Sequence, residues 1–325
     1  MRPGGTALSV LAGVAMALAL TACGGGSGDE GGPPQKKTSL LVGQYPGADS
    51  APLFIAMERG FFKEEGLDVK QEPIQAPQAV LPKLSNGQMD VVLGSYATIL
   101  TIQEQGTEKF VYIADSYQGA PGAFGVMVAK DSPIKQVANL KGKKIGVNVI
   151  GGLGTLTMSP HLKQAGLAPD DVQYVVIPTT EWLSALDKGS VDAVWMTDPY
   201  LSQAERQLGA TMLLDTMSGP TANLPITGWA ATGKWAEDNP ETLAAFQRAM
   251  AKAQQIAATD KSAVTAILPT YTKIPAETAA TINLGAYPTT LDARNIQRVA
   301  DLMLEAGLLK QKMDVSSMIY AAPKG

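Results

Sequence analysis

An internal repeat is the feature that most constrains how this chain can fold. Residues 66–100 have the pattern of a strand, a helix, a second strand that includes Asp90, and the start of another helix. Residues 166–202 repeat this order about a hundred residues later, with Asp192 in the corresponding strand. Two related α/β units predict two lobes, and the facing strand ends of two lobes are a natural place for a ligand.

Length and composition agree with two globular lobes. The chain has 325 residues, of which 45% are hydrophobic and 17% charged, so it can build two domains with their own cores. The formal net charge is −4 at pH 7. Nucleic-acid-binding proteins usually carry a basic face, so no nucleic-acid partner is expected.

Residues 1–23 have the pattern of an export signal. Arg2 gives a short positive start, and the apolar run 6–20 has the length of a signal-peptide core but is short for a membrane span. The run ends in Leu-Thr-Ala-Cys at 20–23, which resembles the lipobox of bacterial lipoproteins. This resemblance implies lipid attachment at Cys23, with cleavage just before it. The alternative is a short anchor helix with an incidental cysteine.

A glycine-rich segment, 24–37, follows the signal and is expected to be a flexible tether. Cys23 is the only cysteine, so no internal disulfide can form and the core must hold the fold. No later stretch is apolar enough over a sufficient length to span a bilayer. These features predict a soluble body tethered at the extracytoplasmic face of the cytoplasmic membrane, in the periplasm if the cell is Gram-negative.

Periodicity and turn signals predict an α/β fold with two chain crossings between the lobes. Strands are expected at 38–44, 110–114, 124–129, 144–149, 211–214 and 226–231, and helices at 51–59, 155–165, 240–258 and 292–306. We assign 38–129 plus 226–325 to lobe 1 and 130–225 to lobe 2. Crossings near residues 130 and 225 would form a two-stranded hinge, which can close without unfolding either lobe.

An ordered set of motifs resembles the solute-binding lipoproteins of ABC importers, in the group that includes nitrate, taurine, alkanesulfonate and thiamine-pyrimidine binding proteins. The motifs lie at 51–56, 60–69, 87–95, 139–147 and 189–193. The resemblance covers about residues 38–310. It implies a type II periplasmic-binding-protein fold that closes on a small solute and delivers it to a membrane permease with its ATPase. The protein is expected to be a monomer.

Four junctions lead from a strand end to a helix, at 45–50, 94–98, 151–157 and 197–200. Helix N-termini carry unpaired N–H groups and partial positive charge, so several of them could hold an anion without arginine. The candidate ligand-binding residues are Tyr45, Ser95, Tyr96, Thr98, Gly154, Thr155, Asp198, Tyr200 and Trp229.

Each candidate also has a plainer interpretation. Ser95 and Asp198 could be helix caps, although Asp198 could instead pair with a ligand amine. The Gly154–Thr155 segment could be an ordinary turn. The aromatic candidates could be core or surface residues rather than walls of a site.

The sequence argues against catalysis, a metal site and a bound cofactor. His161 is the only histidine, and no carboxylate cluster accompanies it. No Gly-x-Ser-x-Gly elbow occurs, and the loop at 151–157 lacks the third glycine of a dinucleotide motif and a Walker lysine. We therefore expect no catalytic residues.

Three functions remain open at this point. Uptake of a small solute, such as a sulfonate, a taurine-like compound, an aromatic acid or a pyrimidine, fits the repeat and the tether. An enzyme like the fungal thiamine-pyrimidine synthases would share the fold and consume a histidine and iron, but those enzymes carry a cysteine-rich motif that this chain lacks. The third possibility is a ligand-sensing subunit of a signalling receptor.

Overall fold

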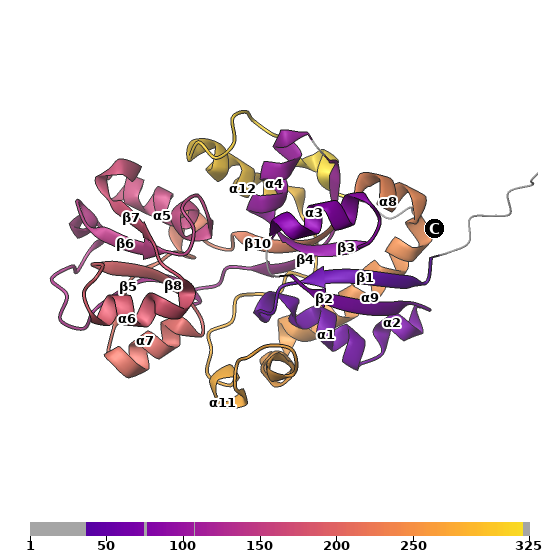
Figure 1. The fold of residues 1–325 in the computed structure, drawn as a ribbon, viewed down its shortest axis with the longest axis horizontal. Coiled ribbons are helices and arrows are strands. Elements are labelled where there is room, and N and C mark those ends of the chain that lie inside the picture. The colour runs from indigo at the N-terminus through magenta and orange to yellow at the C-terminus, as the bar shows by residue number, and fades with distance from the viewer. Residues whose placement is uncertain (1–36, 75–76, 107, 321–325) are drawn as a thin grey trace, which may run out of the picture. The chain divides into compact units, whose positions relative to one another are not determined.

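Ten strands form two separate sheets within the described residues (Figure 1). The computed structural model describes residues 37–74, 77–106 and 108–320, so the predicted signal peptide, Cys23 and nearly all of the tether lie outside the described residues. The strands are β1 Ser39–Gln44, β2 Asp68–Pro73, β3 Val91–Ser95, β4 Phe110–Gln118, β5 Phe124–Val128, β6 Lys144–Val147, β7 Gln173–Val176, β8 Ala193–Thr197, β9 Thr211–Asp215 and β10 Pro225–Thr232.

Helices follow most of the strands, as the sequence predicts. They are α1 Ala51–Glu58, α2 Phe61–Glu64, α3 Pro77–Ser85, α4 Tyr96–Gln105, α5 Leu153–Gln164, α6 Trp182–Asp187, α7 Tyr200–Leu208, α8 Gly233–Asp238, α9 Pro240–Thr259, α10 Lys261–Ile267, α11 Ala276–Ala279 and α12 Ala293–Glu305. Among the helices that the structure describes, none is both long and apolar enough to cross a membrane.

The two sheets have the same topology, which is the structural form of the sequence repeat. The first has the order β2-β1-β3-β10-β4 and the second β7-β6-β8-β5-β9. In each sheet the first three strands are parallel, and the fourth strand in the order runs antiparallel to the third. The second sheet comes from one continuous stretch of chain, coloured magenta to red in Figure 1, between β4 and β10.

The two repeated aspartates, Asp90 and Asp192, make equivalent hydrogen bonds in the two sheets. Asp90, just before β3, accepts a hydrogen bond at Oδ2 from the backbone N–H of Leu41 at 2.9 Å. Asp192, just before β8, accepts one at Oδ2 from the N–H of Lys144 at 2.8 Å. Each carboxylate therefore ties the start of one central strand to its neighbour.

Two crossings join the sheets, from β4 to β5 and from β9 to β10. The sequence placed residues 124–129 in lobe 1, yet β5 pairs with β8 and β9 in the second sheet. The first crossing thus lies at 119–123, earlier than the expected position near residue 130. Asp215 of β9 holds this crossing by accepting a hydrogen bond at Oδ2 from Gly122 N at 3.0 Å. The full division into domains stays a prediction.

The core of the first sheet forms where β10 passes close to α4 and α9. Trp229 of β10 is fully buried and packs edge-on against Phe246 of α9, with ring centroids 6.2 Å apart. On the same strand, a β-carbon at Gly228 would collide with the hydroxyl of Tyr96. That hydroxyl donates to Asp115 Oδ1 at 3.0 Å. Burial raises the pKa of Asp115 to about 7, against the lowering effect of this hydrogen bond.

Candidate functional site

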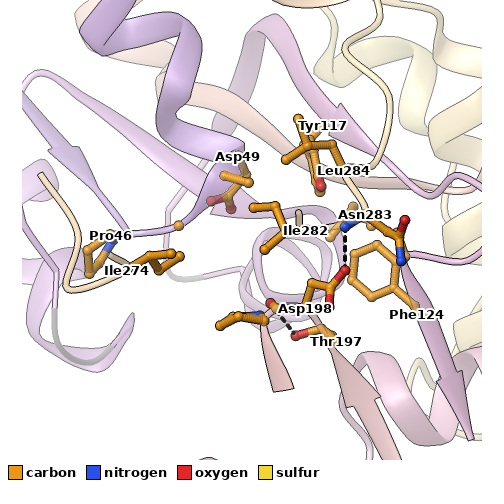
Figure 2. Close-up of a pocket in the computed structure, with 15 residues that line it drawn as sticks. Pro46, Asp49, Tyr117, Phe124, Thr197, Asp198, Ile274, Ile282, Asn283 and Leu284 are labelled. Atoms are coloured by element: carbon orange, nitrogen blue, oxygen red, sulfur yellow. Dashed lines mark hydrogen bonds between the residues drawn. The ribbon is translucent and has the colours of Figure 1, made fainter. Parts of the chain in front are cut away.

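A cavity of about 260 Å³ lies where strand ends of the two sheets face each other (Figure 2). It is lined by the turn between β1 and α1, the ends of β4 and β8, the start of β5 and β10, and an irregular segment before α12. The lining residues are Pro46, Gly47, Ala48, Asp49, Tyr117, Ala123, Phe124, Thr197, Asp198, Pro199, Ile226, Ile274, Ile282, Asn283 and Leu284. This volume is slightly below the usual range for sites that bind drug-sized ligands, so it fits a small solute.

Hydroxyl groups fix the turn that carries Asp49. Tyr271 Oη donates to the carbonyl oxygen of residue 47 at 2.9 Å, and Tyr287 Oη donates to that of residue 48 at 2.8 Å. Ser116 Oγ donates to the carbonyl oxygen of Asp49 at 2.6 Å. Because three successive carbonyls are held by residues of distant elements, the turn is ordered before any ligand arrives.

The Asp49 carboxyl group borders the cavity and is partly buried. Burial raises its pKa from 3.8 to about 6. The backbone N–H groups of Asp49 and Ser50 and the nearby Thr227 hydroxyl lower the pKa, but by less than burial raises it. The charged form of this group therefore costs free energy in the folded protein.

Replacing Asp49 with asparagine is expected to change how stability depends on pH. Because the pKa of Asp49 is raised in the folded state, the wild-type protein loses free energy of unfolding as pH rises from about 4 to about 6. A shift of about two units corresponds to roughly 1–3 kcal/mol, since the group keeps some exposure. The free energy of unfolding is measured with urea at pH 4 and at pH 7.5. Relative to the wild type, Asp49→Asn should be more stable at pH 7.5 than at pH 4 by this amount.

Asp170→Asn is the matched control, because Asp170 is an exposed aspartate in the loop before β7. This variant should show the same difference in free energy of unfolding between pH 4 and pH 7.5 as the wild type. If Asp49→Asn behaved like this control, the Asp49 carboxyl group would not be desolvated as described.

Asp198 stands at the start of α7 and has backbone donors on both oxygens. Oδ1 accepts from Ser202 N at 2.8 Å, as a helix cap does, and Oδ2 accepts from Asn283 N (Figure 2). Arg206 of α7 also donates to Thr281 Oγ1 at 3.1 Å. The segment 281–283 is therefore joined to α7 at two points. Asp198 thus satisfies one backbone N–H in the first turn of α7, although Pro199 occupies the N-cap position, and its role toward a ligand stays a prediction.

Tyr117 and Phe124 give the cavity an aromatic side, with ring centroids 6.4 Å apart. The Tyr117 hydroxyl accepts a hydrogen bond from Gly285 N. Burial raises the pKa of Tyr117 well above its usual value, and the nearby charges of Asp49 and Asp198 raise it further. The hydroxyl therefore keeps its proton and can donate it into the cavity.

Four of the candidates from the sequence lie beside other spaces. Tyr45, Ser95 and Thr98 line a space of about 20 Å³, which is large enough for little more than a water molecule. Tyr200 lines a more open cavity of about 640 Å³ together with Lys273. This second cavity shares Pro46, Pro199 and Ile274 with the first.

Two aromatic candidates, Tyr96 and Trp229, are both 0% exposed. Tyr96 binds Asp115 and Trp229 packs on Phe246, so neither borders the cavity. Their ligand roles stay predictions and would require these core contacts to open. Trp182 and Trp195, which the sequence predicts as core residues, are buried, with 1% and 3% of their surface exposed.

The Gly154–Thr155 segment forms the first turn of α5. Gly154 lies against the ring of Trp195, where a β-carbon would approach Cδ2 to 2.8 Å. Thr155 Oγ1 accepts from Gly151 N at 2.9 Å and donates to the carbonyl of Gly152 at 3.0 Å, which closes the turn. The structure does not bring this segment to the cavity that Asp49 and Asp198 border.

Cavity-lining residues that the sequence did not single out include Asp49, Tyr117, Phe124, Ile226, Ile274 and residues 282–284. Asp49 falls within the 45–50 junction, and an aspartate at a helix start was the available signal. Tyr117 and Phe124 flank the first crossing, which the sequence predicted near residue 130 and which lies at 119–123. Segment 274–284 is mostly irregular, so no periodic pattern marks it.

A family model described as NMT1/THI5 like matches residues 48–263, which is more than half of the chain. The chain belongs to the NMT1/THI5-like family. The expected membership in the group of sulfonate, nitrate and thiamine-precursor proteins is confirmed.

Relatives of this NMT1/THI5-like protein include several binding proteins. A protein of Escherichia coli (strain K12) named for aliphatic sulfonate binding is 29% identical over 247 residues, 74% of this chain and 76% of that protein. The nitrate/nitrite binding protein NrtA of a Nostoc species is 26% identical over 247 residues, 69% of this chain and 54% of that protein. A pyrimidine phosphate synthase of Aspergillus parasiticus is 31% identical over 158 residues, 48% of this chain and 44% of that protein.

A solved structure shows the fold of this NMT1/THI5-like chain. The periplasmic aliphatic sulphonate binding protein SsuA from Escherichia coli aligns with a TM-score of 0.74, covering 89% of this chain and 94% of that one at 23% identity. The predicted two-lobed periplasmic-binding-protein fold, with its two crossings and a cleft between the lobes, is confirmed.

Proposed function

We propose that this chain is an extracytoplasmic solute-binding protein of an ABC importer. It captures a small solute between the two sheets and hands it to a membrane permease that works with an ATPase. The observation that carries the proposal is the cavity between facing strand ends of two sheets joined by two crossings. Relatives named for sulfonate and nitrate binding, which match more than two thirds of the chain, support it.

The amino-terminal sequence supports the proposed location. Residues 1–23 resemble a lipoprotein signal, so we propose that a lipid on Cys23 anchors the protein at the outer face of the cytoplasmic membrane. Segment 24–37 would then give the folded part room to reach a permease. The protein acts as a monomer in this scheme.

The environment of His161 argues against the enzyme alternative. Its Nε2 lies 2.9 Å from Thr221 Oγ1, and that hydroxyl donates to the carbonyl of Thr216 at 2.7 Å. His161 therefore donates to Thr221, and burial lowers the pKa of the imidazole. The ring is buried, and its hydrogen bond to Thr221 joins α5 to the second crossing. Across the described ranges, no three His, Cys, Asp or Glu residues are grouped to hold a metal ion.

Solute binding is tested with the purified mature protein. A solute at 100 times its dissociation constant stabilises the folded state by about 2.7 kcal/mol, which should raise the melting temperature by several degrees. X-ray scattering should show a smaller radius of gyration with the same solute, because the lobes close on it. Failure of sulfonates, organic cations, pyrimidines and nitrate to change either quantity would contradict the proposal.

A further inference from the structure

The charged side chains that border the cavity are all acidic. Asp49 comes from the turn before α1 and Asp198 from the start of α7. Within the part of the chain that the structure describes, no lysine, arginine or histidine lines this cavity. We infer that the solute is a small organic cation, an ammonium group that carries hydrocarbon, which binds with its charge at Asp49. This inference rests on the proposed function and specifies the solute class.

The helix N-termini at this cavity already hold anions from the protein itself. Asp198 takes the free N–H of Ser202 in the first turn of α7. The backbone N–H groups of Asp49 and Ser50, at the start of the helical segment before α1, interact with the Asp49 carboxylate. A sulfonate or nitrate would therefore meet two carboxylates instead of unpaired N–H groups, so the anion site expected from the sequence is not available here.

Neither Asp49 nor Asp198 has a cationic partner among the described residues, and backbone N–H groups interact with both carboxylates. No ion pair to Asp49 is found among the described residues. The raised pKa of its carboxyl group, caused first by burial, agrees with a charge that nothing neutralises. A ligand ammonium would supply the missing charge, and charge-assisted hydrogen bonds are the strong ones.

The remaining walls suit the rest of such a ligand. Tyr117 and Phe124 present aromatic rings, which attract ammonium groups through the ring quadrupole. Ile226, Ile282 and Leu284 supply apolar surface for hydrocarbon. Lys273 lines the neighbouring open cavity rather than this one, and it is not among the groups that shift the pKa of Asp49.

The groups that face Asp49 allow a clear pH test. Tyr45, Tyr117, Tyr271 and Tyr287 all interact electrostatically with its carboxylate, and burial raises the pKa of each phenol above its usual value. These phenols stay neutral between pH 5 and pH 8. Asp198 is the other charged group at the cavity. The affinity for a cation should therefore fall about tenfold between pH 7.5 and pH 5, because protonation of Asp49 competes with binding.

Three probes with one hydrocarbon chain and different head groups test the inference: butylammonium, butanesulfonate and 1-butanol. Calorimetry on the mature protein at pH 7.5 should show butylammonium binding at least tenfold more tightly than either other probe. Asp49→Asn should weaken butylammonium binding at least tenfold and remove its pH dependence. Asp170→Asn should change neither, and circular dichroism confirms that each variant is folded.

Two outcomes would overturn the inference and separate it from the proposed function. Tighter binding of butanesulfonate, or equal binding of 1-butanol, would refute the cationic solute and leave a solute-binding protein standing. No binding of any probe, together with no response to the wider solute panel, would refute both.

Discussion

Trp229→Ala is expected to lower the free energy of unfolding by about 3–5 kcal/mol, the range for removing a buried tryptophan side chain. Trp229 is 0% exposed at the centre of the first sheet, and its ring packs on Phe246 of α9. Alanine would leave a cavity that strands on either side of β10 cannot fill. Urea unfolding monitored by circular dichroism measures the loss.

Trp229→Phe is the matched control for this prediction. Phenylalanine keeps an aromatic ring, and it removes an indole N–H that has no hydrogen-bond partner among the described residues. It should cost clearly less than alanine and leave solute affinity unchanged. A large loss of affinity with unchanged stability would instead favour the ligand-binding role predicted for Trp229 from the sequence.

Asp90→Ala should destabilise the protein by about 3 kcal/mol, and Asp192→Ala by about 1 kcal/mol or less. Both carboxylates accept a backbone N–H of the neighbouring strand. The side chain of Asp90 is 4% exposed and also accepts from Trp235 Nε1 at 2.8 Å, whereas that of Asp192 is 37% exposed. Alanine at Asp90 leaves two part-buried N–H donors and the Lys37 ammonium, which lies 2.5 Å from Asp90 Oδ1, without an acceptor, whereas water can replace the carboxylate of Asp192.

The two variants control for each other, because they occupy equivalent places in the repeat. The free energies of unfolding of the two variants are measured by chemical denaturation. They can be compared when both variants show the same dependence of this free energy on denaturant concentration. Equal losses of free energy of unfolding would mean that the stabilisation comes only from the hydrogen bond to the neighbouring strand. In that case burial of Asp90 and its bond to Trp235 would contribute nothing measurable.

The repeat explains why the sequence predicted the fold well. Strands such as β3 and β8 are short apolar runs that begin after an aspartate, and the helix start at Asn239-Pro240 has a clear local signal. These signals depend on neighbouring residues only. The position of the first crossing depends instead on which sheet accepts β5, and pairing with β8 and β9 is not encoded within the strand.

The site was predicted less completely, for a similar reason. The junctions at 45–50 and 197–200 do meet at one cavity, as expected for strand ends of two sheets that face each other. The side chains that face it were not all identified, because Trp229 points to α9 while Ile226 of the same strand borders the cavity. Strand alternation places side chains on two faces, but only the tertiary structure shows which face is covered.

The exchange of strands between the sheets has a consequence for how the chain matures. The second sheet is complete once residue 215 has emerged, since β5 to β9 are contiguous. The first sheet must wait, because β10 separates β3 from β4 and arrives only at residues 225–232. During synthesis the first sheet, although it contains the first strands of the chain, would therefore be the last to be completed.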